Sequence, residues 1–354
     1  MSDYLNNLNE EVKQYFKILS PEFPQWLIEY IETPAMQRIH GTSICCGLDY
    51  TKLYNIKYMY SNLDHSIGVA LIIWNFTHDK KQTLSGLFHD IATPVFKHCI
   101  DFMNGDSEHQ ESTEERTEQI IKQSKEIMAL LNRDGIKIEE VSDYHIYPIA
   151  DNDTPQLSAD RFEYTFASGL VFHRVWEIDT IKEIYNNITI LKNENGIDEL
   201  GFKDYSICEK YIHIISELWP KWVDDKDRTA MQFLADIVKS MNVKGYLTID
   251  DLYSLSEKEV IDKILNCEDD YIKENFKKFQ NATNVYGSDV FVEDKYCISV
   301  KGKKRYIIPL VRNDNGEVRI NKISVQADRE INGYLDLKFP EFTGFDFDFK
   351  PYNY

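Results

Sequence analysis

The sequence has no apolar run long enough to cross a membrane. Its longest strongly apolar run, residues 67–74, is about eight residues long, whereas a membrane-spanning helix needs roughly 20. Residues 1–14 are polar and acidic, without the basic segment and following apolar segment that mark a secretory signal. We therefore expect no membrane partner and a cytoplasmic location.

Positive charge is also scarce. The 354 residues include 40 Lys and Arg against 59 Asp and Glu, which gives a formal net charge of −19 at pH 7. Such a surface repels phosphate backbones, so nucleic acid is not an expected partner. One strongly basic cluster stands out, KGKKR, which contains Lys301, Lys303, Lys304 and Arg305. We interpret it as an exposed turn between strands, with a regulatory nucleotide, a phosphate chain or a partner subunit as alternative ligands.

Cysteine is sparse and scattered. The sequence has six cysteines, of which Cys45 and Cys46 are adjacent, and it has no CxxC pair. This pattern fits neither a disulfide framework nor a zinc ribbon. We expect a reduced, intracellular protein.

Apolar and aromatic residues are plentiful enough for a large core. Hydrophobic residues make up 43% of the chain and aromatic residues 13%. The apolar run in residues 65–76 predicts a buried helix, and residues 83–91 predict another. Residues 113–132 carry spaced apolar positions typical of an amphipathic helix.

The pattern changes towards the C-terminus. Residues 289–325 alternate apolar and polar positions and contain Asp314-Asn315-Gly316, a hairpin signal. The aromatic residues 342–354 predict a terminal strand or an interaction tail. The sequence thus predicts a mainly α fold, with a helical domain over residues 1–265 and a small mixed α/β region over residues 266–354.

Four residues could together bind a metal ion: His65, His89, Asp90 and Asp160. Two imidazoles and two carboxylates suit Mn, Fe, Co, Ni, Zn or, with more water, Mg. Taken singly, each has an ordinary interpretation: His65 as a core histidine, for example, or Asp160 as a helix cap. Their order along the chain, each at the end of an apolar helix, favours a shared divalent metal ion.

The segments around these residues resemble a known signature. NLDHSIG (62–68), GLFHDIATPVFKH (86–98) and LSADRFEY (157–164) resemble the H…HD…D motif of HD-domain metal-dependent phosphohydrolases. Their nearest likeness is to the dGTPase-like deoxynucleoside triphosphate triphosphohydrolases. The resemblance implies an HD-type helical bundle, a divalent metal on the four residues above, a nucleotide substrate and a homo-oligomer.

The resemblance also implies further site residues. His98 would contact the phosphates, and Asp101 would pair with His109 to assist catalysis. His98 and Asp101 are spaced so that they share one face of a helix. The expected substrate contacts are Gln37, Arg161 and Tyr164.

The sequence departs from this branch in four places. Asn62 replaces an arginine, Thr93 replaces a histidine, Ala167-Ser168 replaces an arginine-aspartate pair, and the stretch from Asp101 to His109 is short. All four changes affect phosphate recognition more than metal binding. Hydrolysis of deoxynucleoside triphosphates to nucleoside and tripolyphosphate is the leading hypothesis. One alternative is a nucleotidase or phosphodiesterase, in which His98 and His109 would bind a second metal ion. The other alternative is a weakly catalytic nucleotide sensor.

Overall fold

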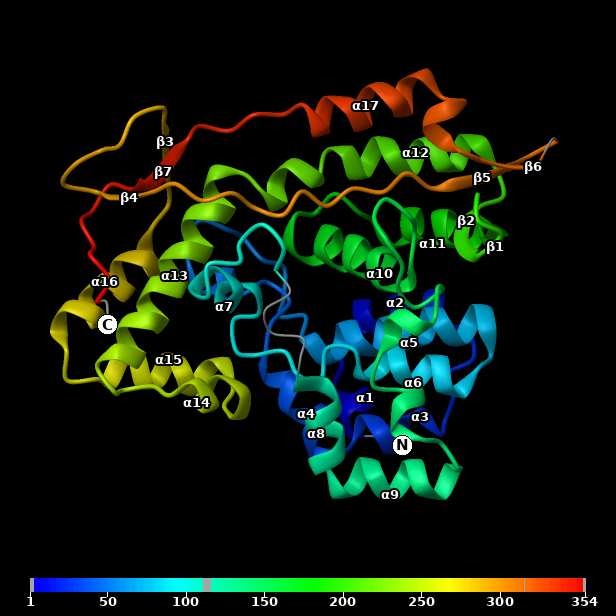
Figure 1. Ribbon diagram of the computed structural model, residues 1–354, viewed down its shortest axis with the longest axis horizontal. Helices are drawn as coiled ribbons and strands as arrows, with labels where there is room; N and C mark the ends of the chain where they lie inside the picture. The colour runs from blue at the N-terminus through cyan, green and yellow to red at the C-terminus, as the bar shows by residue number, and fades with distance from the viewer. Residues whose placement is uncertain (1–2, 111–115, 315, 353–354) are drawn as a thin grey trace.

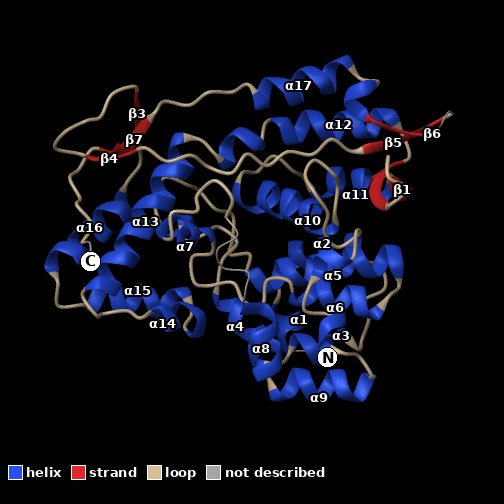
Figure 2. Cartoon of the chain, in the orientation of Figure 1, coloured by secondary structure: helices blue, strands red, loops and turns tan. Residues whose placement is uncertain are grey.

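Helices make up most of the protein, and two small sheets lie at its edges (Figures 1 and 2). The computed structural model describes residues 3–110, 116–314 and 316–352. The helices are α1 (Asp3–Asn7), α2 (Glu10–Leu19), α3 (Leu27–Ile31), α4 (Pro34–Arg38), α5 (Asn62–Thr77), α6 (Lys80–Phe88), α7 (His98–Met103), α8 (Thr117–Gln123), α9 (Lys125–Asp134), α10 (Ala159–Ala167), α11 (Ile178–Asn186), α12 (Tyr205–Ser216), α13 (Asp225–Val243), α14 (Ile249–Ser254), α15 (Glu257–Asn266), α16 (Asp270–Asn281) and α17 (Val325–Leu335). The strands are β1 (Ile188–Lys192), β2 (Asp198–Phe202), β3 (Tyr286–Ser288), β4 (Tyr296–Ile298), β5 (Leu310–Asn313), β6 (Gly316–Arg319) and β7 (Phe342–Phe345).

This arrangement confirms the predicted fold class, a mainly helical protein with a smaller α/β region. The apolar side chains form two cores. One is built on α2, α5, α6, α10, α11 and α12, and the other on α7, α13, α15 and α16. None of the helices in the described ranges is long and apolar enough to span a lipid bilayer.

Helix α5 is the centre of the first core. Its residues from Leu63 to Ile73 are buried on every side, because the run is apolar all round and α6 and α10 pack against it. Ser61 caps its N-terminus by accepting a hydrogen bond from the backbone of Asp64, while the Asp64 carboxylate accepts one from the backbone of Ser61. The predicted helix at residues 65–76 is therefore correct, with its start three residues earlier.

The predicted helix at residues 113–132 is two helices. Ser124 ends α8 and caps α9, accepting a hydrogen bond from the backbone of Ile127 at 3.3 Å. A serine that can bond the backbone competes with continued helix, and the apolar spacing alone did not reveal this break. Residues 113–115 lie outside the described ranges.

The C-terminal region is interleaved with both cores. The predicted hairpin is present as β5 and β6, with Asn313 opposite Gly316, while Asn315 is outside the described residues. Strand β7 lies between β3 and β4, so the aromatic tail begins as a strand packed on the body. Strands β1 and β2, which the helical prediction for the first 265 residues missed, join β5 in one sheet. The predicted boundary at residue 265 stays a prediction.

Candidate metal centre

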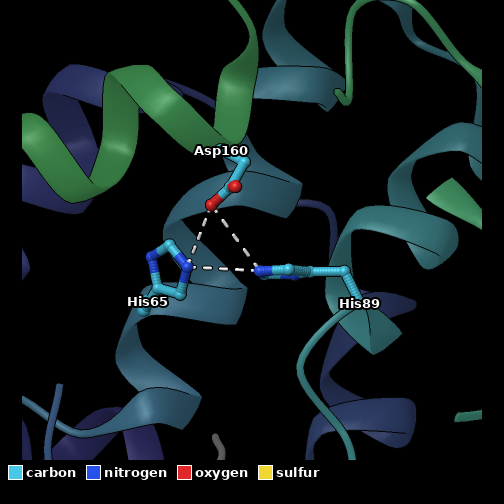
Figure 3. A group of neighbouring side chains, drawn as sticks. All are labelled: His65, His89 and Asp160. Carbon is cyan, nitrogen blue, oxygen red and sulfur yellow. Dashed lines mark hydrogen bonds and ion pairs between the residues drawn. The ribbon is translucent and has the colours of Figure 1, made fainter. Parts of the chain in front are cut away.

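Three helices bring two histidines and an aspartate together (Figure 3). His65 is in the first turn of α5, His89 directly follows α6, and Asp160 is in the first turn of α10. The two Nε2 atoms lie 3.2 Å apart. The Asp160 Oδ1 atom lies 3.2 Å from Nε2 of His65 and 3.7 Å from Nε2 of His89. Three potential ligand atoms from separate segments thus converge on one point.

Both imidazoles are held with the same nitrogen facing that point. Nδ1 of His89 donates a hydrogen bond to the carbonyl of Gly86 at 2.7 Å, and Nδ1 of His65 donates to the carboxylate of Glu163. A histidine whose Nδ1 is protonated in this way presents the lone pair of Nε2. Two lone pairs and a carboxylate oxygen form a donor set that fits a divalent metal ion.

The charges around the group favour a cation between its members. Burial alone would lower the pKa of His65, but Glu163 and Asp160 beside it raise the pKa to about 10, so a metal ion that binds Nε2 would displace a proton from it. Burial would raise the pKa of Asp160, but His65 and His89 lower it to about 2. The site therefore combines buried donors with a strongly negative local field.

Glu163 supports the three candidate ligands His65, His89 and Asp160, called the metal group, from the side of His65 that faces away from them. Its side chain is fully buried on α10, one helical turn after Asp160, and its Oε1 accepts a hydrogen bond from the Tyr60 hydroxyl at 2.6 Å. A Cβ atom at Gly68 would lie 2.6 Å from the same oxygen, so a larger residue there would displace this carboxylate. The sequence analysis missed Glu163, although its i, i+3 spacing from Asp160 was a usable signal.

Asp90, predicted as a fourth ligand, lies beside the group. Its Oδ2 is 3.8 Å from Nε2 of His65 and 3.7 Å from Nε2 of His89. The same oxygen is 3.0 Å from Nζ of Lys97, which also donates to Oδ1 of Asn62 at 2.5 Å. Burial would raise the pKa of Asp90, but Lys97 and the two histidines hold it well below its usual value.

Lys97 is a site residue that the sequence analysis missed. Its side chain is 11% exposed, and its backbone has a φ of +43°, which is strained for a residue with a side chain. Its ammonium group donates a hydrogen bond to Asn62, one of the positions where the sequence departs from the branch that it resembles. A positive charge therefore lies next to residue 62, on a different segment of the chain.

The metal group lies in a cavity of about 760 Å³. His98 lines this cavity, and its Nδ1 is 3.0 Å from Oδ2 of the buried Asp101, so these two predicted catalytic residues are paired. Burial lowers the pKa of His98 despite this carboxylate. Arg161 and Tyr164, predicted substrate contacts, also line the cavity.

Two predicted residues lie elsewhere. His109 is 79% exposed and pairs with Asp106 at 3.2 Å, so the expected pairing of Asp101 with His109 is not formed. The amide of Gln37 donates to the carbonyl of Ile31 at 2.9 Å, and Gln37 is not among the residues that line the cavity. The roles assigned to both stay predictions.

The chain is similar to several known proteins. No family model matches it. It is 22% identical over 301 residues to the uncharacterized protein YdhJ of Bacillus subtilis, covering 84% of this chain and 87% of that protein. It is also 22% identical over 240 residues to the metal-dependent phosphohydrolase cns2 of Cordyceps militaris, covering 66% of each.

A solved structure confirms that the fold occurs elsewhere. A hypothetical protein from Aquifex aeolicus superposes with a TM-score of 0.61 and 16% identity, covering 91% of this chain and 92% of that one. At this identity the likeness concerns the fold alone. The name of cns2 gives that protein as a metal-dependent phosphohydrolase and specifies no substrate.

Proposed function

We propose that the chain is a metal-dependent phosphohydrolase of the HD-domain superfamily, and that it cleaves deoxynucleoside triphosphates to nucleoside and tripolyphosphate. The convergence of the His65 and His89 Nε2 atoms with the Asp160 carboxylate carries this proposal. A divalent ion, when bound there, polarises a phosphoryl oxygen and lowers the pKa of water. The donor set admits Mn, Fe, Co, Ni, Zn and Mg alike.

The cavity supports a nucleotide substrate. Its volume of about 760 Å³ falls within the range typical of small-molecule sites. Lys97 and Arg161 line its wall, and each is also paired with a lining carboxylate, Asp90 at 3.0 Å and Asp151 at 3.4 Å respectively. Tyr164 and Phe172 add aromatic surface. The Tyr164 ring packs edge-on against Trp222, with 5.4 Å between the ring centroids. One cavity thus offers charge for phosphates and aromatic rings for a base or sugar.

His98 takes the proton-transfer role in this proposal. Because Asp101 accepts from Nδ1 of His98, the neutral imidazole keeps an unprotonated Nε2 at the cavity wall. Water adds its oxygen to the α-phosphorus, and the bond from that phosphorus to the 5′-oxygen breaks. Nε2 of His98 accepts the proton of the water and returns it to the leaving 5′-oxygen. The products are a nucleoside and tripolyphosphate.

Product analysis tests the proposal. The chelator-stripped protein would be reloaded with each of the six metals and incubated with deoxynucleoside triphosphates, ribonucleoside triphosphates, monophosphates and cyclic dinucleotides. We expect nucleoside and tripolyphosphate, and no product with Asp160→Asn. His213→Gln, which changes a half-exposed histidine paired with Glu330 at the surface, is the matched control and keeps activity.

Other outcomes identify the alternatives. Orthophosphate or an opened phosphodiester would keep a metal-dependent phosphohydrolase and replace its substrate. Nucleotide binding without turnover by any metal form would overturn the enzymatic proposal in favour of a sensor.

A further inference from the structure

Positive groups extend along one cavity wall, from the metal group towards the C-terminal region. Oδ2 of Asp90 lies 3.7 Å from Nε2 of His89 and 3.0 Å from Nζ of Lys97. His98 follows Lys97 in the chain, and its Nε2 is 3.4 Å from a terminal nitrogen of Arg305. Metal donors, an ammonium, an imidazole and a guanidinium therefore follow one another along this wall.

Arg305 reaches the cavity from a distant part of the sequence. It belongs to the segment between β4 and β5, drawn in orange from the left to the right of the molecule (Figure 1). Lys303 and Arg305 both line the cavity, while Lys304 points away and donates to the carbonyls of Leu335 and Leu337, at 2.7 and 2.9 Å, at the end of α17. Such alternation is what an extended segment produces. Two of the four basic residues, Lys303 and Arg305, thus line the cavity, while Lys301 is 79% exposed as expected for an exposed turn.

The charge of Arg305 is not neutralised by a direct partner in the described part of the chain. Its hydrogen bonds there go to the amide oxygen of Gln110, at 2.5 Å, and to Nε2 of His98. Both partners are neutral, since burial lowers the pKa of His98. The nearby Asp227 carboxyl also lines the cavity and feels the charge of Arg305 without a hydrogen bond to it. A half-buried guanidinium that faces a cavity and hydrogen-bonds only neutral groups in the described ranges favours an anionic ligand.

We propose that Arg305 binds the phosphoryl group of the substrate that lies farthest from the metal group, and thereby selects substrates with a phosphate chain over monophosphates. This inference rests on the proposed function, because it takes the metal group as the reacting end. Lys97, beside Asp90, lies next to the reacting phosphoryl group. A planar guanidinium can bind two phosphate oxygens at once, which suits the end of a flexible chain.

The test measures binding of two inorganic probes to the full-length chain by calorimetry. The probes are tripolyphosphate and orthophosphate, titrated into the wild type and into Arg305→Gln, Arg305→Lys and Arg312→Gln. Arg312, an exposed arginine on β5, is the matched control. Thermal unfolding of each variant verifies that it is folded.

We expect Arg305→Gln to weaken tripolyphosphate binding about 10- to 100-fold, the size typical of losing a charge-assisted contact. Orthophosphate binding should change less than about threefold, because that probe is too short to reach Arg305 from the metal end. The tripolyphosphate affinity of Arg305→Lys should lie between that of Arg305→Gln and that of the wild type. The inference is overturned if Arg305→Gln binds tripolyphosphate as the wild type does, or if it weakens both probes equally.

The outcome is separable from that of the proposed function. Tripolyphosphate binding that depends on Arg305, in a protein that hydrolyses nothing, would support this inference and overturn the proposed activity. If the protein hydrolyses nucleotides and Arg305→Gln binds tripolyphosphate as tightly as the wild type, the proposed activity would be supported and this inference overturned.

Discussion

The buried carboxylate of Glu163 accepts a hydrogen bond from Nδ1 of His65 on the side of the ring away from the metal group. This bond sets both the orientation and the protonation of the imidazole, so that Nε2 is available as a ligand. A second carboxylate behind a metal-binding histidine strengthens binding without touching the ion. The relationship makes Glu163 a positioning residue for the centre.

Glu163→Gln should lower metal affinity about 10- to 100-fold, because the neutral amide holds His65 less firmly and removes negative charge behind it. Calorimetric titration of Mn²⁺ into stripped protein measures this. Glu330→Gln is the matched control, since Glu330 accepts from Nδ1 of His213 at 2.8 Å in the same geometry at the surface. Equal affinities of the two variants would show that Glu163 plays no part in metal binding.

Gly68→Ala should displace the Glu163 carboxylate by steric overlap. The added Cβ would lie 2.6 Å from Oε1 of Glu163, which Tyr60 holds by a hydrogen bond. We expect a loss of about 1–3 kcal/mol in the free energy of unfolding, measured in urea, and weaker metal binding. Gly333→Ala, at an open position on α17, should instead stabilise the protein by about 0.5–1 kcal/mol. Identical urea midpoints for the two variants would contradict this account.

Arg319→Ala should be among the most destabilising single changes. Arg319, on β6, makes two hydrogen bonds to the fully buried carboxylate of Glu199 on β2, at 2.6 and 2.8 Å. Removing the guanidinium leaves a buried charge without its partner, at a cost of about 3–5 kcal/mol in unfolding free energy. Arg133→Ala, which breaks an exposed ion pair with Glu29, should cost less than about 1 kcal/mol.

The Arg319–Glu199 ion pair also predicts that a double variant regains part of the lost stability. The double variant Arg319→Met, Glu199→Leu should unfold at a higher urea concentration than Arg319→Ala, because no unpaired buried charge remains. A double variant less stable than the single one would argue against this explanation.

His173 should make stability fall in mild acid. Burial, with a contribution from nearby Lys221, lowers the pKa of His173 to about 3, and its buried Nε2 has no hydrogen-bond partner among the residues that the structure describes. The unfolded chain therefore binds a proton more readily than the folded chain does. This stabilisation is complete above the unfolded pKa near 6.5 and is lost as the pH falls towards 3.

A comparison with His173→Phe isolates this effect from other titrating groups. Between pH 7 and pH 4.5 the wild type should lose about 2 to 3 kcal/mol more unfolding free energy than the variant. Parallel pH profiles for the two proteins would exclude the role assigned to His173.

The sequence predicted the parts of the site that depend on local order. His65, His89 and Asp160 each adjoin an apolar helix, and helices of that kind pack together through their apolar faces. The shared helix face of His98 and Asp101 followed from helical spacing in the same way, although the partner expected for Asp101 was His109.

The site residues whose surroundings the sequence did not reveal depend on long-range packing. Arg305 meets Gln110 across 195 residues of chain, and only the path of the segment between β4 and β5 decides which side of it faces the cavity. Lys97 reaches Asn62 through a backbone conformation that residue type does not predict. The role of His109 came from the family resemblance, and the structure exposes this side chain.

Metal stoichiometry tests the central claim most directly. Wild type, Asp160→Asn, His89→Gln and the control His213→Gln would be stripped, reloaded with each candidate ion, desalted and analysed for bound metal. We predict one tightly bound ion per chain in the wild type and in the control, and its loss in both site variants. A wild type that retains none of the six ions, or site variants that retain as much metal as the control, would contradict the assignment of His65, His89 and Asp160 as a metal centre.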